Sequence, residues 1–470
     1  MLYKRAHFIG IGGVGMSAVA KLLKDSGVKV SGSDEEVYPP ISTFLEELGI
    51  RPSTYTAQNL PPDADLIVIG KNAKLVPETN EQVKAAFDSG KKILSFPEVL
   101  GELSQEKEVV AVVGSYGKST TTALVSHILE TAGKDPSFFI GAIPYTPVQN
   151  AHMGKGKLFI VEGDEYPSSN TDPRAKFLLL RPSHVHITPL AHDHYNVFPT
   201  AEDYLKPFEE LLTILPQNGA LVACCEGPLS DRFLSKIVRP VTTYGVSHGE
   251  FQAKNISWGE ITAFDITRND KTIVRVATTQ LGEHNIQNIV GAAALLLTLG
   301  VVSPEEFAAG VTTFLGITRR LDKKSARTSI PIFEGFGSSY EKLRSAIEAV
   351  IQHFPKRRLI VVFEPHTFSW RNRGAISWYD TAFAGAQKIY IYEPASQGAA
   401  THTQLTHEEI VERVKGAGFD AQAISDPKAA LAIIEEDLKP NDVVLLSTSG
   451  NLGGLIETIP LMAEKKYPAA

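Results

Sequence analysis

One short segment of this chain, residues 111–122, combines the residue types that bind phosphate groups. It reads Ala-Val-Val-Gly-Ser-Tyr-Gly-Lys-Ser-Thr-Thr-Thr, and its two glycines allow a tight turn whose N–H groups point into the loop. The lysine can reach terminal phosphates, and a hydroxyl that follows it can ligate Mg²⁺. The spacing predicts an ATP-binding loop, with an ordinary strand-to-helix turn as the alternative. The residues assigned to it are Gly114, Ser115, Gly117, Lys118, Ser119 and Thr120.

A second glycine-rich stretch opens the chain at His7–Met16, with glycines in dinucleotide-binding spacing and an acidic residue roughly 20 positions later. Taken alone, this pattern predicts a nicotinamide- or flavin-dependent dehydrogenase. A dehydrogenase, however, needs no separate phosphate loop later in the chain. Two nucleotide-type sites instead favour an ATP-driven enzyme whose nucleotide-linked substrate places its pyrophosphate at a helix N-terminus. The residues assigned to that substrate are Gly10, Gly12, Gly13, Gly15, Met16, Ser33 and Asp34.

Two further predicted strands end in polar side chains. Leu158–Glu165 ends in three carboxylates, and Val185–His194 ends in an Asp-His pair. Together with Lys118, these strand ends are expected to converge on one edge of a sheet, where doubly wound folds bind ligands. Glu162 and His194 would suit a divalent cation there, with solvated loop residues as the alternative. The remaining histidines of this stretch, His186 and His192, are expected to be structural.

Asn285 and Asn288 lie one helical turn apart before an Ala-rich segment, so they share a helix face and could bind the edge of an adenine ring. Simple helix capping by Asn285 is the alternative.

The elements that position these residues alternate between strand and helix along the whole chain. At 470 residues, with about 150 per domain, the length predicts about three domains. We expect an α/β protein with a Rossmann-like N-terminal domain, a central mononucleotide-binding domain of P-loop type and a Rossmann-like C-terminal domain. The predicted boundaries are 1–104, 105–316 and 317–470. Phe251–Val276 should form a hairpin that turns at Arg268-Asn-Asp-Lys.

Composition narrows the possible partners. The net charge of −7 comes without any basic run, so nucleic acid is not expected as a partner. Cys224 and Cys225 are adjacent and form neither a disulfide framework nor a zinc site. The N-terminus carries a predicted strand rather than a signal peptide, and the longest apolar run, Ile289–Val302, is shorter than the ~18 residues of a membrane span. We therefore expect a cytoplasmic protein without membrane contact, present as a monomer or weak dimer.

Taken together, the chain resembles the Mur ligase family, which adds amino acids or peptides to UDP-linked muramic acid in peptidoglycan synthesis. The resemblance covers essentially the whole chain. It is carried by Gly10–Gly15, Ser31–Asp34, Gly114–Thr120, Glu162–Glu165, Asp193–His194, His284–Asn288 and Thr318–Asp322.

Narrower features resemble the branch that joins L-Ala-γ-D-Glu-meso-diaminopimelate to UDP-N-acetylmuramate during recycling. The first alternative is the branch that adds L-alanine, and the second is a non-catalytic homologue that only binds nucleotides. The features that favour the tripeptide branch are Gly32–Thr43, Gly163–Tyr166, Asp172–Phe177 and Asn196–Thr200.

The resemblance implies that ATP phosphorylates the muramic acid carboxylate and that an amine then attacks the acyl phosphate. Lys118, Glu162, His194 and Arg320 would be the catalytic residues. Mg²⁺ would be held by Ser119, or Thr120, with Glu162 and His194. ATP would also contact Asn285 and Asn288 at adenine, Arg320 at phosphate and Glu334 at the ribose.

The third domain departs from the family pattern. Where related ligases carry a His pair, this chain has Ser338-Ser339, and His192 stands where a Trp or an acid usually precedes Asp-His. We interpret the change as retuning toward a different amine rather than as lost activity. Candidate residues for the incoming amine are Glu364–Thr367, Ser447–Asn451, Lys342, Arg371 and Arg373.

Overall fold

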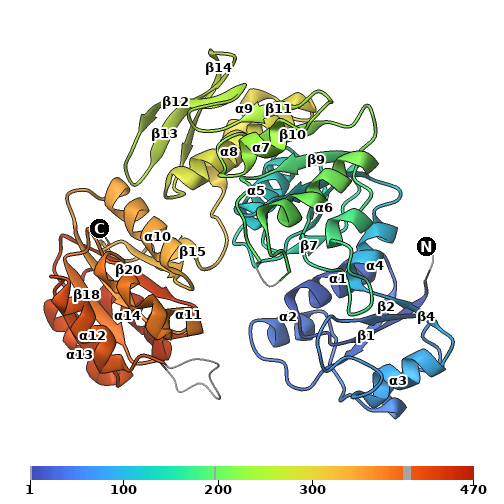
Figure 1. Cartoon of the computed structure of the whole chain (residues 1–470), viewed down its shortest axis with the longest axis horizontal. Helices are drawn as coiled ribbons and strands as arrows, with labels where there is room; N and C mark the ends of the chain where they lie inside the picture. Colours follow the sequence, from blue (N-terminus) through green and yellow to red (C-terminus); the bar gives the residue numbers. More distant parts are fainter. Residues whose placement is uncertain (1–2, 195–196, 395–403, 470) are drawn as a thin grey trace. The chain divides into compact units, whose positions relative to one another are not determined.

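The computed structural model describes residues 3–194, 197–394 and 404–469 (Figure 1). Asn196, in one of the stretches that carry the family resemblance, lies outside these residues. The described strands form three sheets, and the chain divides into two compact units. The first unit comprises residues 1–255, 264–276 and 286–314, and the second comprises residues 256–263, 277–285 and 315–470.

The first sheet is parallel, with the strand order β2-β1-β3-β4. Alternate residues of β1 face opposite sides: Ala6 and Phe8 pack with the helices α1 and α4, and Ile9 packs with α3. The strands are β1 (Arg5–Ile9), β2 (Lys29–Ser33), β3 (Leu66–Ile69) and β4 (Lys92–Leu94). The helices are α1 (Val14–Asp25), α2 (Ile41–Glu47), the 3₁₀ helix Ala57–Asn59, α3 (Glu81–Asp88) and α4 (Phe96–Leu103).

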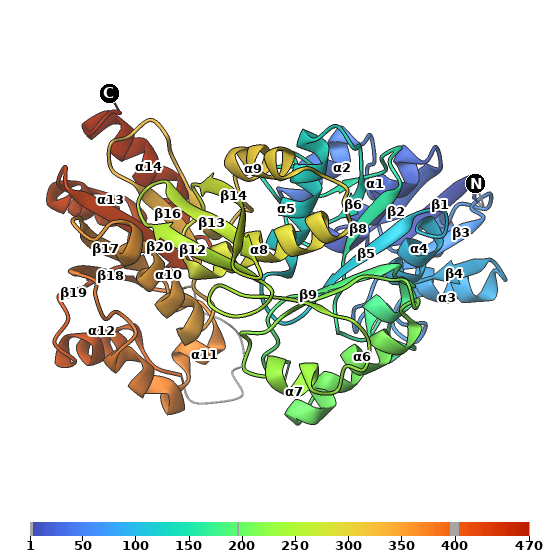
Figure 2. The same ribbon diagram turned by 90° about the horizontal axis from the view of Figure 1, so that it is seen from above.

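The central sheet has the order β14-β13-β12-β11-β10-β9-β5-β8-β6-β7, and Figure 2 shows α5 and α9 on one face of it and α6 and α7 on the other. Its strands are β5 (Glu108–Val113), β6 (Ser137–Phe139), β7 (Ala151–His152), β8 (Leu158–Glu162), β9 (His184–Ile187), β10 (Leu221–Cys224), β11 (Thr242–Tyr244), β12 (Phe251–Ser257), β13 (Thr262–Arg268) and β14 (Lys271–Thr278). Its helices are α5 (Lys118–Thr131), the 3₁₀ helix Lys176–Leu179, α6 (Ala201–Ile214), α7 (Ser230–Leu234), α8 (Glu283–Thr298) and α9 (Pro304–Thr313).

The third sheet lies in the second unit, with the order β15-β16-β20-β17-β18-β19. Its strands are β15 (Arg320–Lys323), β16 (Ile332–Phe336), β17 (Arg358–Phe363), β18 (Lys388–Tyr392), β19 (Ala421–Ile424) and β20 (Asp442–Thr448). Its helices are α10 (Tyr340–His353), α11 (Phe368–Arg371), the 3₁₀ helix Arg373–Asp380, α12 (His407–Gly416), α13 (Pro427–Asp437), the 3₁₀ helix Leu452–Gly454 and α14 (Leu455–Lys466). Antiparallel β15 covers one edge, and the other pairings are parallel.

One continuous apolar cluster joins the first two sheets into a single unit. It runs from β1, α1 and α4 into β5, β8 and α6. Gly101 of α4 allows the close approach, because a Cβ there would lie 2.3 Å from the Leu179 carbonyl oxygen. Phe96 of α4 and Phe139 of β6 stack across the same boundary with ring centroids 6.1 Å apart. The loops at the carboxyl ends of β1, β5 and β8 are therefore held in fixed relative positions.

The predicted hairpin at Phe251–Val276 is confirmed as β12, β13 and β14, which are neighbours in the central sheet. Asn269 and Asp270 form the β13–β14 turn with positive φ angles of 49° and 62°, which Asn and Asp tolerate better than most residues. Among the described helices, none has both the length and the apolar character needed to cross a bilayer.

Candidate functional site

The phosphate loop joins β5 to α5 by way of two glycines with positive φ, 130° at Gly114 and 84° at Gly117. A Cβ at Gly114 would lie 2.3 Å from Thr188 Oγ1, and a Cβ at Gly117 would lie 2.5 Å from Asn288 Oδ1. No other residue type fits either position without displacing these neighbours. The loop ends at the N-terminus of α5, where free N–H groups and the helix dipole favour an anion.

Lys118, the first residue of α5, is held between Gly114 and Glu165. Its Nζ donates to the Gly114 carbonyl oxygen at 2.6 Å and to Glu165 Oε2 at 2.7 Å. Burial would lower the pKa of Lys118, but the surrounding Glu165, Asp164 and Glu162 carboxylates outweigh it, so that the pKa is raised. The ammonium is therefore charged at neutral pH and pre-positioned in the loop.

Glu165 is fully buried and connects three parts of the site. Besides Lys118, its carboxylate accepts from Tyr204 Oη at 3.2 Å and lies 3.3 Å from His194 Nε2. Burial raises its pKa, but His194 and Lys118 more than compensate and keep the pKa below its usual value. Tyr204 also contacts Ser115 Oγ at 2.7 Å, so α6 anchors the phosphate loop through this network. Sequence reasoning missed Tyr204, whose place on an ordinary amphipathic helix gave no signal.

Glu162 lies at the end of β8, next to β5 in the sheet. Ser119 Oγ donates to Glu162 Oε1 at 2.8 Å, and the Gly141 N–H donates to Oε2 at 2.7 Å. Burial raises the pKa of Glu162, and these two hydrogen bonds oppose the increase. The predicted convergence of the ends of β5, β8 and β9 on one edge is confirmed, because β5 pairs with both other strands.

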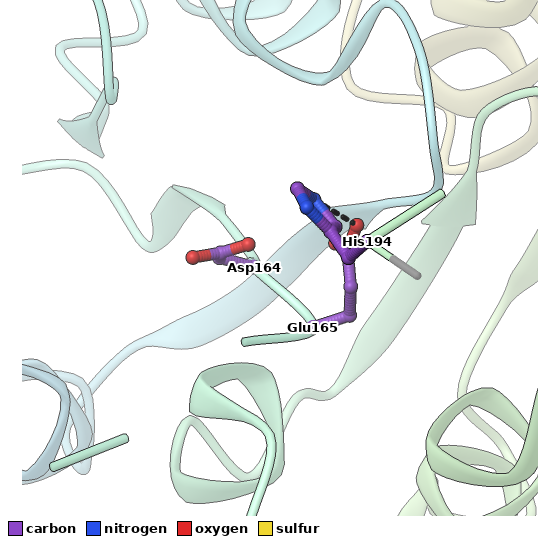
Figure 3. A group of neighbouring side chains, drawn as sticks. All are labelled: Asp164, Glu165 and His194. Carbon is purple, nitrogen blue, oxygen red and sulfur yellow. Dashed lines mark ion pairs between the residues drawn. The ribbon is translucent and has the colours of Figure 1, made fainter. Parts of the chain in front are cut away.

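His194 follows β9 and faces the same edge (Figure 3). Its φ of 56° is rare for a residue with a side chain, and such local strain is concentrated at functional sites. The hydrogen bond to Glu165 raises the pKa of His194. His192, by contrast, points its Nε2 to the Phe198 carbonyl oxygen at 2.8 Å.

Asp164, Glu165 and His194 each offer an atom to a group within 4.8 Å, which could hold a metal ion (Figure 3). The sequence-based set was Ser119, Glu162 and His194; the structure pairs Ser119 with Glu162 and groups His194 with Asp164 and Glu165. Carboxylate and hydroxyl oxygens are the ligands that Mg²⁺ prefers, so the residues present fit this ion.

A cavity of about 820 Å³ extends from the glycine-rich start of the chain to the phosphate loop, entirely within the first unit. At one end it is lined by Gly10, Gly12, Gly13, Gly15, Met16 and Asp34, and at the other by Lys118, Glu162 and Asp164. A volume of this size accommodates a ligand larger than a single nucleotide base, and the two predicted nucleotide loops face one space.

Asp34 organises the glycine loop. Its Oδ2 accepts from the Gly12 N–H at 2.6 Å, and its Oδ1 accepts from Tyr55 Oη at 2.9 Å. Ser33, assigned to the same ligand from sequence, is fully buried instead, with its hydroxyl hydrogen-bonded to Gln82 and close to His7. Its side chain therefore supports the sheet behind the loop and is not part of the cavity wall.

The two asparagines of α8 have different surroundings. Asn288, in the first unit, is buried, and its Oδ1 accepts from Thr121 Oγ1 at 3.4 Å behind the phosphate loop. Asn285, in the second unit, donates from Nδ2 to the Leu281 carbonyl oxygen at 2.8 Å.

In the second unit, Glu334 is buried on β16 between two cations. Arg319 Nε donates to its Oε1 at 3.1 Å and Lys324 Nζ to its Oε2 at 2.7 Å. Arg320 begins β15 and is exposed, and its charge adds to burial in lowering the pKa of His284 to about 4.

The loop after β16, which carries Ser338 and Ser339, is fixed by its neighbours. Trp370 Nε1 donates to the Gly337 carbonyl oxygen at 2.8 Å, and Thr367 Oγ1 donates to the Ser338 carbonyl oxygen at 3.0 Å. Ser339 caps α10 through the Lys342 N–H, whereas Ser338 Oγ accepts from Lys342 Nζ at 3.0 Å. At the position that differs from the family pattern, the Ser338 hydroxyl therefore binds the ammonium group of Lys342.

Glu364, at the end of β17, is buried beside this loop. Its Oε2 accepts from Thr448 Oγ1 and from the Leu452 N–H, and its Oε1 lies 3.3 Å from His366 Nδ1. The two predicted polar strand ends, Glu364–Thr367 and Ser447–Asn451, therefore meet at one edge of the third sheet.

Comparison with known proteins identifies the family. The model described as "Mur ligase family, catalytic domain" matches residues 5–108, and the "Mur ligase middle domain" matches residues 112–296. A UDP-N-acetylmuramate–L-alanine ligase from Geobacter sp. (strain M21) is 30% identical over 97% of this chain and 97% of its own length. The chain belongs to the Mur ligase family.

Solved structures agree with this assignment. The UDP-N-acetylmuramate:L-alanyl-γ-D-glutamyl-meso-diaminopimelate ligase from Neisseria meningitides is 31% identical, with a TM-score of 0.62 over 67% of this chain and 100% of that one. UDP-N-acetylmuramate-alanine ligase from Thermotoga maritima, at 23% identity, shares the fold with a TM-score of 0.78 over 98% and 99% of the two chains. As a Mur ligase, this chain has the three-domain α/β fold and is an ATP-dependent ligase that forms amide bonds in peptidoglycan synthesis.

Proposed function

We propose that this ligase joins a peptide, L-Ala-γ-D-Glu-meso-diaminopimelate, to UDP-N-acetylmuramate through an acyl-phosphate intermediate. The cavity supports the part of this proposal that concerns the sugar nucleotide, because it connects a dinucleotide-type glycine loop with an ATP-type phosphate loop. A substrate with a pyrophosphate at one end and a reactive carboxylate at the other fits that arrangement. The relatives' names point to the same substrate.

The proposed roles follow the domain boundaries inferred from sequence. Residues 1–104 bind the UDP-sugar, residues 105–316 bind ATP, and residues 317–470 bind the amine, with Arg320 at phosphate and Glu334 at the ribose. Lys118 neutralises the phosphates as the carboxylate attacks, because two anions cannot approach without it. Asn285 and Asn288 are the proposed adenine contacts.

Mg²⁺ would be held by Ser119, Glu162 and His194, with Asp164 and Glu165 beside them, and would supply charge neutralisation of the transferred phosphoryl group. Glu165 orients both Lys118 and His194. The buried network that includes Tyr204 keeps these groups in place before any ligand arrives.

The choice of a peptide as the amine is supported by cations at the edge of the third sheet. Arg319 lies 5.0 Å and Lys342 5.5 Å from the Phe336 ring centroid, and Arg371 is buried nearby with its Nη2 donating to the His366 carbonyl oxygen. A tripeptide carries several carboxylates and needs more positive charge than alanine does.

Phosphate release tests the proposed activity. The full chain with ATP, Mg²⁺ and UDP-N-acetylmuramate should release phosphate when the tripeptide is added, and mass spectrometry should detect the amide product. The Lys118→Ala variant should lose at least about 100-fold in kcat, because it removes charge at the transferred phosphoryl group. If neither the tripeptide nor L-alanine raises phosphate release, the proposed activity is wrong.

L-alanine addition is the second candidate. It is supported by the Geobacter relative, which matches nearly the whole chain at 30% identity and is named for that reaction. The same assay with L-alanine in place of the tripeptide distinguishes the two.

A further inference from the structure

Two lysines outside the predicted site line the same cavity. Lys71 follows β3 in the first domain, and Lys176 begins the 3₁₀ helix at the end of the loop that follows β8. Among the described residues that line the cavity, the cations are Lys71, Lys118 and Lys176. Lys118 is already assigned to ATP, which leaves two cations without a role.

Lys71 is held by a backbone carbonyl oxygen and an aromatic ring, with the Asp164 carboxylate near enough to oppose a decrease in its pKa. Its Nζ donates to the Pro167 carbonyl oxygen at 3.0 Å and lies 5.4 Å from the Tyr166 ring centroid. Within the described parts of the chain it makes no ion pair. Burial, and then the nearby charge of Lys176, lower the pKa of Lys71, and the Asp164 carboxylate offsets this decrease only in part.

Lys176 is held more firmly. Its Nζ lies 2.5 Å from Asp164 Oδ2 and 5.4 Å from the Phe96 ring centroid, and its side chain is only 20% exposed. Asp164 belongs to the group that faces His194, and Tyr166 meets the His194 ring edge-on at 4.7 Å. Lys176 therefore contacts a residue of the proposed cation site, and Tyr166 lies between Lys71 and His194.

The two lysines lie where the reacting end of the sugar nucleotide has to be. The substrate's pyrophosphate is expected at the glycine loop, and its carboxylate has to reach the γ-phosphate beside Lys118. We propose that Lys71 and Lys176 form a two-lysine clamp that binds the lactyl carboxylate of UDP-N-acetylmuramate and orients it for phosphorylation. This inference rests on the proposed function, because it assumes that this sugar nucleotide is the substrate.

Comparing two ligands isolates the carboxylate contact. UDP-N-acetylglucosamine is the same sugar nucleotide without the lactyl group, so a clamp specific for the carboxylate affects only UDP-N-acetylmuramate. We would titrate both ligands calorimetrically into the full chain saturated with Mg²⁺ and a non-hydrolysable ATP analogue.

Lys71→Met is the primary variant because it breaks no ion pair, and Lys176→Met is the second. Lys71→Arg keeps the charge, and Lys84→Met, at an exposed position of α3, controls for net charge.

We expect wild type to prefer UDP-N-acetylmuramate, Lys71→Met to lose that preference by about tenfold, and Lys71→Arg and Lys84→Met to retain it. Lys176→Met should act in the same direction. Equal weakening of both ligands would mean that the lysines hold the pyrophosphate or the fold, and would overturn the clamp. An unchanged preference in Lys71→Met, or equal affinities in wild type, would overturn it as well while leaving the ligase activity intact. Failure of wild type to bind either ligand would instead refute the proposed function, and the clamp with it.

Discussion

At the scale of single residues, the site depends on a buried carboxylate whose contacts hold Lys118, the proposed catalytic cation. Glu165 pairs with Lys118 at 2.7 Å, lies 3.3 Å from His194 and accepts from Tyr204. Removing one partner of a buried ion pair leaves the other charge uncompensated and free to reorient. Glu165 is thus a positioning residue in this account, because it acts on substrate only through Lys118 and His194.

Glu165→Gln should therefore lower kcat for phosphate release by roughly 10–100-fold, since the amide keeps the size of the side chain but not its charge. Glu210→Gln, at an exposed position of α6, is the matched control and should behave like wild type. The measurement is steady-state phosphate release with saturating UDP-N-acetylmuramate and amine. Wild-type kcat in Glu165→Gln would show that Lys118 does not need this partner.

Sequence reasoning located some of these residues and not others, for physical reasons. Lys118 and the carboxylates after β8 were predictable, because glycine spacing and a buried strand that ends in acids are local signals. The pairing of Lys118 with Glu165 depends on two neighbouring strands of the central sheet, and the approach of Lys71 to Lys176 depends on how two domains pack, so no local pattern reveals either contact. Ser33 shows the opposite case: it follows the glycine-loop pattern, yet strand alternation turns its side chain into the core.

At the scale of elements, the loop after β8 connects the central domain to the first. Asn170 Nδ2 donates to the Asn72 carbonyl oxygen at 2.9 Å and to the Leu75 carbonyl oxygen at 3.4 Å. Within the same loop, the Arg174 guanidinium donates two hydrogen bonds to the Asp172 carboxylate. The loop carries Tyr166 at the cavity wall, so its docking shapes the proposed sugar-nucleotide site.

Asn170→Ala should raise KM for UDP-N-acetylmuramate severalfold and leave KM for ATP within about twofold, because the lost hydrogen bonds, worth about 1 kcal/mol each, hold the wall of one substrate only. Thr171→Ala, at the neighbouring position, is the control. A parallel change in both KM values would indicate that the loop supports the whole unit rather than the sugar-nucleotide site.

A buried histidine on β9 makes stability depend on pH. His186 is fully buried and stacks on Tyr244 at 5.1 Å, and burial lowers its pKa to about 3. The unfolded chain binds a proton at this residue below about pH 6.5, whereas the folded chain does not, so stability falls as pH decreases from 6.5 toward 3. At pH 5 this residue alone should cost about 2 kcal/mol of folding free energy relative to pH 7.5.

His186→Phe keeps an aromatic ring beside Tyr244 but cannot titrate, and the Tyr244 hydroxyl retains the Ile187 carbonyl oxygen as an acceptor. Urea unfolding at pH 7.5 and pH 5 should show a smaller pH-dependent loss in the variant than in wild type, by about 2 kcal/mol. Equal losses in the two proteins would mean that His186 titrates normally in the folded state.

At the scale of the whole molecule, the fold was more predictable than the choice of amine. Alternating strand and helix signals predicted the α/β class, and the predicted strand that ends in carboxylates is β8, Leu158–Glu162. In the proposed function, specificity for the amine depends instead on a few side chains around Ser338, where strands distant in sequence meet. No periodicity encodes that arrangement, and the relatives' names include both amines.

The most direct test of the account compares kcat/KM for L-Ala-γ-D-Glu-meso-diaminopimelate and for L-alanine on one preparation of the full chain. The cations near Ser338 predict that the tripeptide is preferred by at least about tenfold, or ~1.4 kcal/mol of transition-state binding. A preference for L-alanine of the same size would contradict the account and assign this chain to the L-alanine-adding branch.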